Sequence, residues 1–334
     1  MINVGIIGYG YWGKHILRNF SGHEATCVRA LCDTNTQALQ QARQVFPGLE
    51  MYADCQNLLR SANLDAVAII TPSETHYDLA RTCLQHGKHI FIEKPFVATE
   101  AQADELINLA TQKNLTIMID HTFLFSSPVR KIKELIDDDV LGTLYYFDSM
   151  RVNLGPFRHD ANVVWDLAPH DFSIIDYLIE DKPVALSACG KSLFGNGIED
   201  VGYITLYFHS NVIAHINLNW LSPIKVRTTY IGGAKKMLVW DDLNPNECIK
   251  IYDKGVVVEN RNGHCNHLVS AHSGDMWSPK VDQQEALRLE VDHFVDCLLR
   301  DTVPISDGHT GLRVVKLLEA ANASLKTGGK LMYL

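Results

Sequence analysis

An acid and a histidine lie four residues apart in the stretch VVWDLAPHDFSIID, residues 163–176. Side chains at positions i and i+4 share one face of a helix, so Asp166 and His170 can address the same hydroxyl group. Histidine has an ordinary pKa of about 6.5, which suits a general base at neutral pH. Pro169 is tolerated in a first helical turn, so we expect the helix to begin near Asp166. The alternative is a capping Asp166 and a packed His170.

A glycine-rich motif of the form G-x-G-x-x-G follows the apolar run at residues 2–7 and opens a helical pattern. In this context the first glycine permits a tight turn, the second admits a pyrophosphate, and the third lets helix and strand pack closely. Unpaired N–H groups at the helix start can then bind phosphate. A plain tight turn is the alternative. We predict a dinucleotide site that includes Gly8, Gly10, Tyr11, Trp12 and Gly13.

Asp33 follows the second strand-like run and lies 20 residues after Gly13. A carboxylate at this point accepts hydrogen bonds from the ribose hydroxyls of a dinucleotide. It would repel a 2′-phosphate at about 4 Å by roughly 4 kcal/mol at an effective dielectric of 20. Thr34 and Asn35 follow it, with no arginine. The sequence therefore predicts NAD rather than NADP, although Asp33 as a simple helix cap is the alternative.

Strand-like and helix-like segments alternate through the first third of the chain. Apolar runs that are hydrophobic on both faces, separated by amphipathic helices, are typical of a parallel sheet covered on each side. This pattern predicts an N-terminal doubly wound Rossmann domain over residues 1–122. Its later strands are expected at 65–71, 89–94 and 116–122, and its later helices at 75–86 and 99–113.

From about residue 143 successive strand-like runs are joined by short turns and interrupted by the helix near Asp166. Such runs favour an antiparallel sheet. Two helices, at about 282–300 and 308–327, close the chain. We expect an α/β domain followed by an α+β domain, the second spanning 123–334 and containing a large, open, mostly antiparallel sheet.

Composition excludes several functional classes. The net charge of −9 disfavours a nucleic-acid or anionic membrane surface, because those partners require clustered Lys and Arg. No segment approaches the roughly 20 apolar residues of a membrane span, and the first residues, MINVGIIGYG, do not resemble a basic leader. Eight cysteines without a CxxC pair are typical of reduced thiols. We therefore expect a cytoplasmic protein.

Two further motifs lie at strand ends, IEKPF (92–96) and TPSETHYDLA (71–80), and DLAPHD (166–171) follows later, at a helix start. Ligands bind at the carboxyl edge of an open α/β sheet, although a lysine there can also be a solvated strand end. Together with the glycine motif, these segments resemble the glucose-fructose oxidoreductase, inositol dehydrogenase and rhizopine-catabolism family, called Gfo/Idh/MocA. The resemblance covers nearly the whole chain, and EKP is its most specific part.

The resemblance implies a nicotinamide-dependent dehydrogenase. It places Lys94 between nicotinamide and substrate, where an amine can stabilise a developing alkoxide. It matches Asp166 and His170 to a D-x-x-x-H pattern, leaving open whether Lys94 or His170 takes the proton. It also implies a cis Lys94–Pro95 bond and a homodimer or homotetramer formed through the open sheet. The residues that it adds to the dinucleotide site are Thr71, Pro72, His76, Glu93 and Lys94.

Polar residues before the Asp166 helix are candidates for binding a substrate. Hydrogen-bonding groups with an arginine suit a sugar or nucleotide sugar, although each can equally be a solvated loop residue. The segment VVWDLAPHDFSI is similar to members encoded with surface-polysaccharide biosynthesis enzymes, which points to an activated sugar. The alternatives are a small polyol dehydrogenase and a non-catalytic sugar sensor. The candidates are Arg151, Asn153, Arg158 and Asn162, with His159 nearby.

A histidine-rich segment near residue 265 is the remaining cluster with metal-binding residue types. Its spacing fits no standard zinc pattern, and Gly, Ser and Asn surround it. We predict no metal site and expect a loop near the substrate pocket or a subunit contact. The residues concerned are His264, Cys265, His267 and His272.

Overall fold

The chain packs into two compact units in this computed structural model, which describes residues 1–61, 63–155, 157–159, 161–195, 197–260 and 267–334. The first unit comprises Met1–Phe125 and Gln284–Lys316, and the second comprises Ser126–Gln283 and Leu317–Leu334. The predicted boundary after residue 122 lies close to the break after Phe125. Gln284–Lys316 packs with the first unit, whereas the predicted division into 1–122 and 123–334 assigns it to the second domain. That division stays a prediction about functional domains.

A six-stranded parallel sheet forms the centre of the first unit, in the order β3-β2-β1-β4-β5-β6. Most of its strand residues are buried, as expected for strands covered on both faces. The order reverses between β1 and β4, and this switch point lies beside the glycine motif. The strands are β1 (Ile2–Ile7), β2 (Thr26–Cys32), β3 (Glu50–Tyr52), β4 (Ala66–Ile69), β5 (His89–Glu93) and β6 (Ile117–Asp120).

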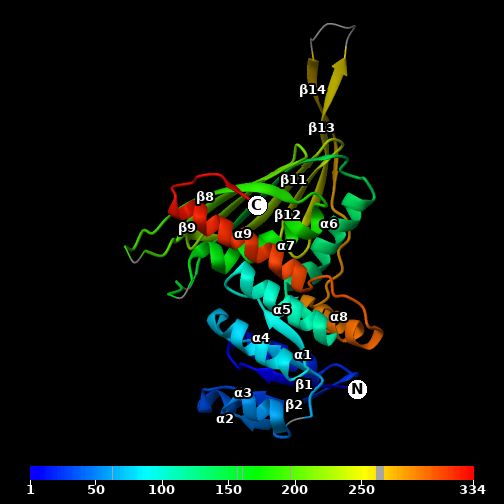
Figure 1. The fold of residues 1–334 in the computed structure, drawn as a ribbon. Coiled ribbons are helices and arrows are strands. Elements are labelled where there is room, and N and C mark those ends of the chain that lie inside the picture. The colour runs from blue at the N-terminus through cyan, green and yellow to red at the C-terminus, as the bar shows by residue number, and fades with distance from the viewer. Residues whose placement is uncertain (62, 156, 160, 196, 261–266) are drawn as a thin grey trace. The chain divides into compact units, whose positions relative to one another are not determined.

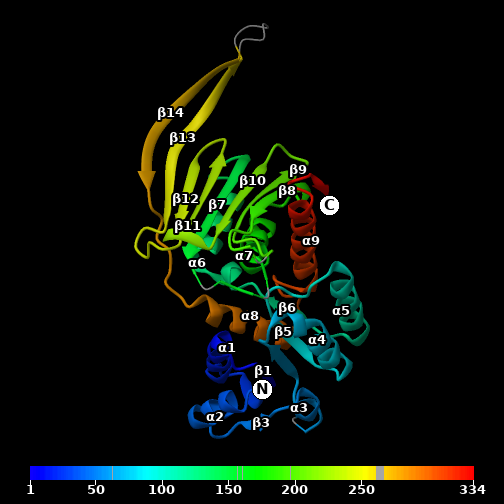
Figure 2. The same cartoon turned by 90° about the vertical axis from the view of Figure 1, so that its left-hand side faces the viewer.

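Helices cover both faces of this sheet, which confirms the predicted doubly wound fold (Figure 2). One face carries α1 (Tyr11–Ser21), α2 (Thr36–Val45) and α8 (Ala286–Arg300). The other carries α3 (Cys55–Ser61), α4 (His76–Gln85) and α5 (Glu100–Lys113). Leu84, Ile92 and Leu106 belong to the continuous apolar core beneath this second set. Hydrophobic burial therefore holds the strand ends of the sheet in fixed positions.

Helix α8 joins the first unit although it is distant in the sequence. The rings of Phe20, Phe91 and Phe294 are buried and meet edge to face at centroid distances of 5.6–6.1 Å. Each such ring contributes roughly 2–3 kcal/mol by burial. Helix α8 is observed from Ala286, somewhat later than the predicted start at 282.

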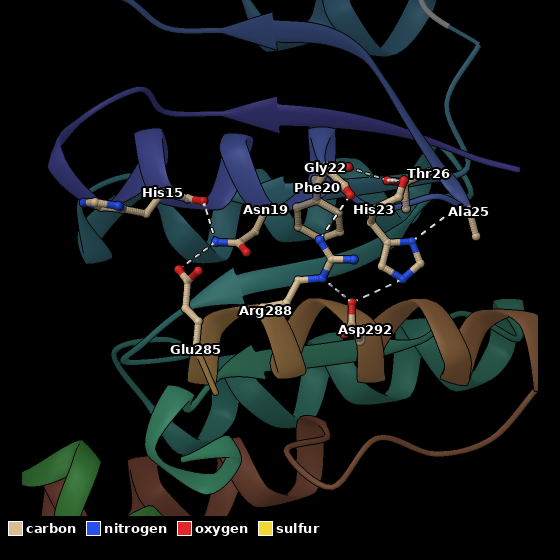
Figure 3. A network of polar contacts seen from close by, with 10 residues as sticks. All are labelled: His15, Asn19, Phe20, Gly22, His23, Ala25, Thr26, Glu285, Arg288 and Asp292. Atoms are coloured by element: carbon tan, nitrogen blue, oxygen red, sulfur yellow. Dashed lines mark hydrogen bonds and ion pairs between the residues drawn. The ribbon is translucent and has the colours of Figure 1, made fainter. Parts of the chain in front are cut away.

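A polar network lines the same α1–α8 contact (Figure 3). Glu285 binds Arg18 and accepts a hydrogen bond from Asn19, and Asp292 contacts Arg288 at 2.8 Å and His23 at 3.4 Å. These charged side chains are largely solvated, so each pair contributes about 0–1 kcal/mol. The aromatic cluster, rather than this network, accounts for most of the packing energy.

A nine-stranded mixed sheet forms the second unit, in the order β14-β13-β12-β11-β7-β10-β9-β8-β15. Most neighbours are antiparallel, as predicted, but β10 pairs with β7 in parallel. The strands are β7 (Leu144–Leu154), β8 (Pro183–Lys191), β9 (Val201–Phe208), β10 (Ile213–Asn219), β11 (Leu221–Gly233), β12 (Met237–Asp241), β13 (Ile249–Asn260), β14 (His267–Trp277) and β15 (Met332–Tyr333). A crossover that contains a helix leads from β7 to β8, so that β8 runs in the same direction as β7. Two antiparallel steps, β8 to β9 and β9 to β10, then bring β10 parallel to β7.

Helices lie against one face of this sheet. Helix α7 (Val163–Leu178) packs on β7, β9 and β10, and α6 (Ser127–Asp137) packs beside α7. Helix α9 (Gly308–Lys326) belongs to the first unit up to Lys316 and to the second beyond it. The other face of the sheet lacks such a cover in the described part of the chain.

The prediction that the α7 helix begins near Asp166 is wrong. The helix begins at Val163, and Asn162 caps it by accepting a hydrogen bond from the backbone N–H of Trp165. Pro169 consequently lies inside the helix, where it removes one backbone donor, rather than in the first turn. Asp166 and His170 still share a helix face, because their spacing is unchanged.

Strands β13 and β14 form a long hairpin that extends beyond the other strands of its sheet (Figures 1 and 2). His264 and Cys265 from the histidine-rich segment lie outside the described residues, whereas His267 and His272 are part of β14. None of the helices that the structure describes is long and apolar enough to cross a membrane.

The two first glycines of the motif provide a matched test of the fold. A Cβ on Gly8 would lie 2.2 Å from the carbonyl oxygen of Ile70, and Gly8 has a φ of +101°. A Cβ on Gly10 would meet no atom within 4 Å. Gly8→Ala should therefore lower the free energy of unfolding by about 2 kcal/mol or more, and Gly10→Ala by less than about 0.5 kcal/mol. Urea denaturation without added cofactor measures both, and equal losses would contradict this packing.

Candidate active site

The glycine motif forms a turn that leaves a helix end open. Gly8 follows β1, and its N–H donates to the carbonyl of Cys32 at 2.8 Å. Gly10 occupies the N-cap of α1, with no capping side chain and no acidic residue in the first turn. The free N–H groups of the helix and the positive end of its dipole thus face the space beside Gly10, which the side chain of any other residue would occupy. These features fit the pyrophosphate of a dinucleotide.

Asp33 stabilises the same turn. Its Oδ2 accepts a hydrogen bond from the backbone N–H of Tyr9 at 2.7 Å, and its Oδ1 accepts one from Asn35 at the same distance. Asn35, in turn, caps α2. Asp33 therefore lies beside the glycine turn at the end of β2, in the position that the cofactor prediction requires.

Two further segments lie at the carboxyl ends of neighbouring strands. Thr71 and Pro72 follow β4 and lead into a short 3-10 helix, η1 (Ser73–Thr75), while Lys94 follows β5. The Lys94–Pro95 bond is cis, as the resemblance implied. Because β4 and β5 are parallel neighbours, these segments meet at one edge of the sheet.

His76 links these two segments from beneath. Its ring is fully buried, with Nδ1 2.9 Å from the carbonyl oxygen of Pro95 and Nε2 2.9 Å from that of Thr71. Burial lowers the pKa of His76, although its contacts with backbone carbonyls oppose that shift. We therefore interpret the predicted ligand-lining His76 as a buried support for the Thr71 and Pro95 segments.

In the second unit, Asp166 and His170 line a cavity of about 230 Å³. Asp166 is held by the Arg158 guanidinium at 3.4 Å and by the indole Nε1 of Trp220 at 3.3 Å. The histidine is half-buried on the same face of α7. The lining residues are Arg151, Val152, Asn153, Gly155, Arg158, Asp166, Leu167, His170, Trp220, Lys225 and Arg227.

A buried ion pair fixes one wall of this cavity. Arg151, on β7, contacts Asp171 of α7 at 3.0 Å, and Ser149 donates to the same carboxylate at 2.6 Å. Arg151 is 7% exposed and Asp171 is 1% exposed. Asp171 directly follows His170, so this contact fixes the helix that presents the histidine.

The other predicted substrate residues separate into two groups. Asn153 and Arg158 line the cavity with Arg151. Asn162 is not among the lining residues: its amide oxygen caps α7 and its amide nitrogen donates to Glu199 at 2.8 Å. His159 is exposed and does not line the cavity. Of the predicted catalytic groups, Lys94 belongs to the first unit and His170 to the second, so their convergence stays a prediction.

Sequence reasoning missed the cavity residues contributed by β11. Lys225 and Arg227 both line the cavity, and Lys225 lies where the register of β11 with β7 shifts. Arg227 contacts Asp242 at 3.1 Å. Lys225 is exposed, and Asp166, the acid that lines the cavity, pairs with Arg158. The K-x-R spacing was a usable signal, but nothing in the local sequence connects β11 to α7.

Comparison with known proteins places the chain in a family. Residues 2–121 match the model described as "Oxidoreductase family, NAD-binding Rossmann fold", and residues 129–239 match the "GFO/IDH/MocA C-terminal domain". A UDP-N-acetylglucosamine 3-dehydrogenase of Acidithiobacillus ferrooxidans is 24% identical over 94% of both chains. An uncharacterized oxidoreductase, YdgJ of Escherichia coli, is 30% identical over 51% of each chain.

Solved structures share the fold over almost the full length. The UDP-N-acetylglucosamine 3-dehydrogenase from A. ferrooxidans superposes with a TM-score of 0.80 at 22% identity, covering 98% of both chains. An aldose-aldose oxidoreductase from Caulobacter crescentus gives 0.84 at 18% identity, covering 100% of this chain and 99% of its own. The family descriptions confirm the predicted resemblance and the NAD cofactor class. The chain belongs to the Gfo/Idh/MocA family of oxidoreductases, with an NAD-binding Rossmann domain at its N-terminus.

Proposed function

We propose that this oxidoreductase oxidises a secondary alcohol of a nucleotide sugar, with NAD as cofactor. The observation that carries the proposal is the cavity in the second unit, which combines Asp166 and His170 with four cationic side chains. The similarity to a UDP-N-acetylglucosamine 3-dehydrogenase over 94% of the chain supports a substrate of this class. The cytoplasmic location predicted from the cysteine pattern remains part of the proposal.

In this proposal His170 accepts the proton of the substrate hydroxyl. NAD, when bound, supplies the hydride acceptor. Asp166 orients the hydroxyl or the imidazole, and Arg158 and Trp220 hold its carboxylate in place. Lys94 stabilises the alkoxide electrostatically as its charge develops. A general base in this position typically contributes about 10²–10⁴-fold to the rate.

The charges of the cavity favour an anionic substrate over a small neutral polyol. Three of its cations have carboxylate partners: Arg151 with Asp171, Arg158 with Asp166, and Arg227 with Asp242. Lys225 is exposed in an irregular part of β11 and has no such partner among the described residues. We assign Lys225 to the phosphate groups of the substrate, since an ammonium group binds phosphate as a point charge. A non-catalytic sensor would not require Lys94, Asp166 and His170 together.

We further propose that the outer face of the nine-stranded sheet joins subunits into a homodimer or homotetramer. On β9, Tyr203 and Tyr207 alternate with buried residues and are 40% and 39% exposed. Ile213 on β10 and Tyr230 on β11 are likewise exposed at 44% and 46%. Contiguous exposed aromatic and aliphatic side chains are typical of an interaction surface.

A panel of substrates tests the proposed class. With NAD present, UDP-sugars should produce reduced nicotinamide, measured by its absorbance, whereas the corresponding free sugars and inositols should produce far less. Lys225→Met should raise KM for the active nucleotide sugar about tenfold, the equivalent of one lost charge-assisted hydrogen bond, with little change in kcat.

Two controls accompany this experiment. Lys225→Arg should retain most of the affinity, and Lys191→Met, which removes an exposed lysine of β8 outside the cavity, should have no effect. Activity on inositols but not on nucleotide sugars would instead support a polyol dehydrogenase.

Replacing His170 tests the base. His170→Asn should reduce turnover by ~100-fold or more and leave the Kd for NAD unchanged, because the substitution removes the proton acceptor alone. His159→Asn is the matched control, since His159 is exposed and outside the cavity lining. Stopped-flow turnover and cofactor titration measure the two effects. Unchanged turnover would exclude His170 and leave Lys94 as the proton acceptor.

The proposed assembly is testable by light scattering. The purified protein should have a mass that is a multiple of the 37.5 kDa chain, and Tyr230→Asp should reduce it because a charge then enters the contact. Val45→Asp, at an exposed position on α2, is the control and should leave the mass unchanged. A wild-type protein that is monomeric at micromolar concentration would refute the proposed interface.

A further inference from the structure

Two buried carboxyl groups meet in the first unit, at the strand beside Glu93, the residue that precedes Lys94. Glu290 lies on α8 and is 0% exposed, and Asp120 ends β6 and is 1% exposed. Asp120 and Thr122 are close enough to Glu290 to influence the pKa of its carboxyl group. An ionised carboxylate is costly to bury without donors, so the hydrogen bonds of this pair determine its charge.

Asp120 has two donors of its own. The indole Nε1 of Trp12 donates to Oδ2 at 2.6 Å, and the hydroxyl of Thr122 donates to Oδ1. Trp12 belongs to the first turn of α1, between Gly10 and Gly13 of the glycine motif. Both oxygens of Asp120 thus accept hydrogen bonds from donors outside the pair, so a hydrogen bond between the two acids has to use a proton on Glu290. Through the indole, Asp120 anchors the first turn of α1.

Glu290 has the opposite surroundings. Neither of its carboxyl oxygens accepts a hydrogen bond from a described residue, and the hydroxyl proton of Thr122 is already donated to Asp120. Its other charged neighbour is Glu93, a further acid. Burial first, and then Asp120, raise the pKa of Glu290 well above its ordinary value, although the nearby Thr122 hydroxyl opposes that shift. No group of three or more His, Cys, Asp or Glu within the described ranges is arranged to hold a metal ion.

We infer that Glu290 is a positioning residue: as a neutral acid it donates a hydrogen bond to Asp120, and so fixes the carboxylate that anchors Trp12 beside the dinucleotide site. Protonation turns a contact between two acceptors into a hydrogen bond to an ionised group, which is among the stronger kinds. The path from Glu290 through Asp120 to Trp12 joins α8, β6 and α1. Helix α8 thereby acts on the glycine motif through Asp120 and Trp12.

The predicted effect of Glu290 on NAD binding rests on the proposed function, whereas the predicted protonation of Glu290 does not. Glu290→Gln keeps the shape of the side chain and a donor, so the Kd for NAD should stay within about twofold of wild type. Glu290→Ala removes the donor and should raise that Kd about tenfold, the loss expected for one hydrogen bond to a charged group.

Two measurements without turnover test the positioning role itself. Infrared difference spectra at neutral pH should contain a protonated carboxylic acid band that is absent in Glu290→Gln. In protein labelled with ¹⁵N-tryptophan, the indole N–H resonance of Trp12, assigned among the five tryptophans by Trp12→Phe, should move in Glu290→Ala and stay in Glu290→Gln.

Several outcomes would overturn the inference. One is the lack of an acid band that depends on Glu290, and another is a Glu290→Gln variant that weakens NAD binding as much as Glu290→Ala. A third is an unmoved Trp12 resonance in a folded Glu290→Ala, which would indicate a packing role alone. If Glu290→Ala does not fold, the infrared comparison of wild type with Glu290→Gln still decides whether Glu290 carries the proton that the inference requires. A protein that binds NAD but oxidises no nucleotide sugar would refute the proposed function and leave this inference intact.

Discussion

The buried ion pair between Arg151 and Asp171 is the interaction on which the candidate active site depends. Separating the partners would leave an uncompensated buried charge, at a cost of about 3–5 kcal/mol. That is a large part of the roughly 5–15 kcal/mol that stabilises a typical domain. Because Asp171 directly follows His170, the pair that joins α7 to β7 also sets the direction of the histidine. Arg151 thus serves both as cavity wall and as anchor.

Features encoded by neighbouring residues could be predicted from the sequence. The glycine turn, Asp33 at the end of β2 and the alternation of strands with helices depend on short-range geometry, and the structure contains each of them. The i, i+4 spacing of Asp166 and His170 similarly survives an error in the helix boundary. That error arose because Asn162, rather than Asp166, supplies the cap, and because Pro169 is tolerated inside α7.

Features that depend on distant partners could not be predicted. Lys225 and Arg227 reach the cavity because β11 pairs with β7, a register that no local pattern specifies. Asp171 looks like one more polar residue of a helix until its contact with Arg151 is known. Likewise, helical spacing puts Glu290 on the apolar face of α8 with Leu287 and Phe294, but no local pattern shows that Asp120 lies against that face.

Two buried acids of this protein, one paired with a cation and one protonated, explain why the net charge of the chain does not predict the charge of its substrate. The protein carries a net charge of −9, yet the cavity is rich in cations. Asp171 is neutralised by Arg151, and Glu290 avoids a charge by keeping its proton, so neither acid adds negative potential to the sites that they support. Local potential, rather than net charge, then attracts a ligand, since ions beyond about 10 Å are screened at moderate salt. An acidic protein can therefore present a basic cavity to an anionic sugar derivative.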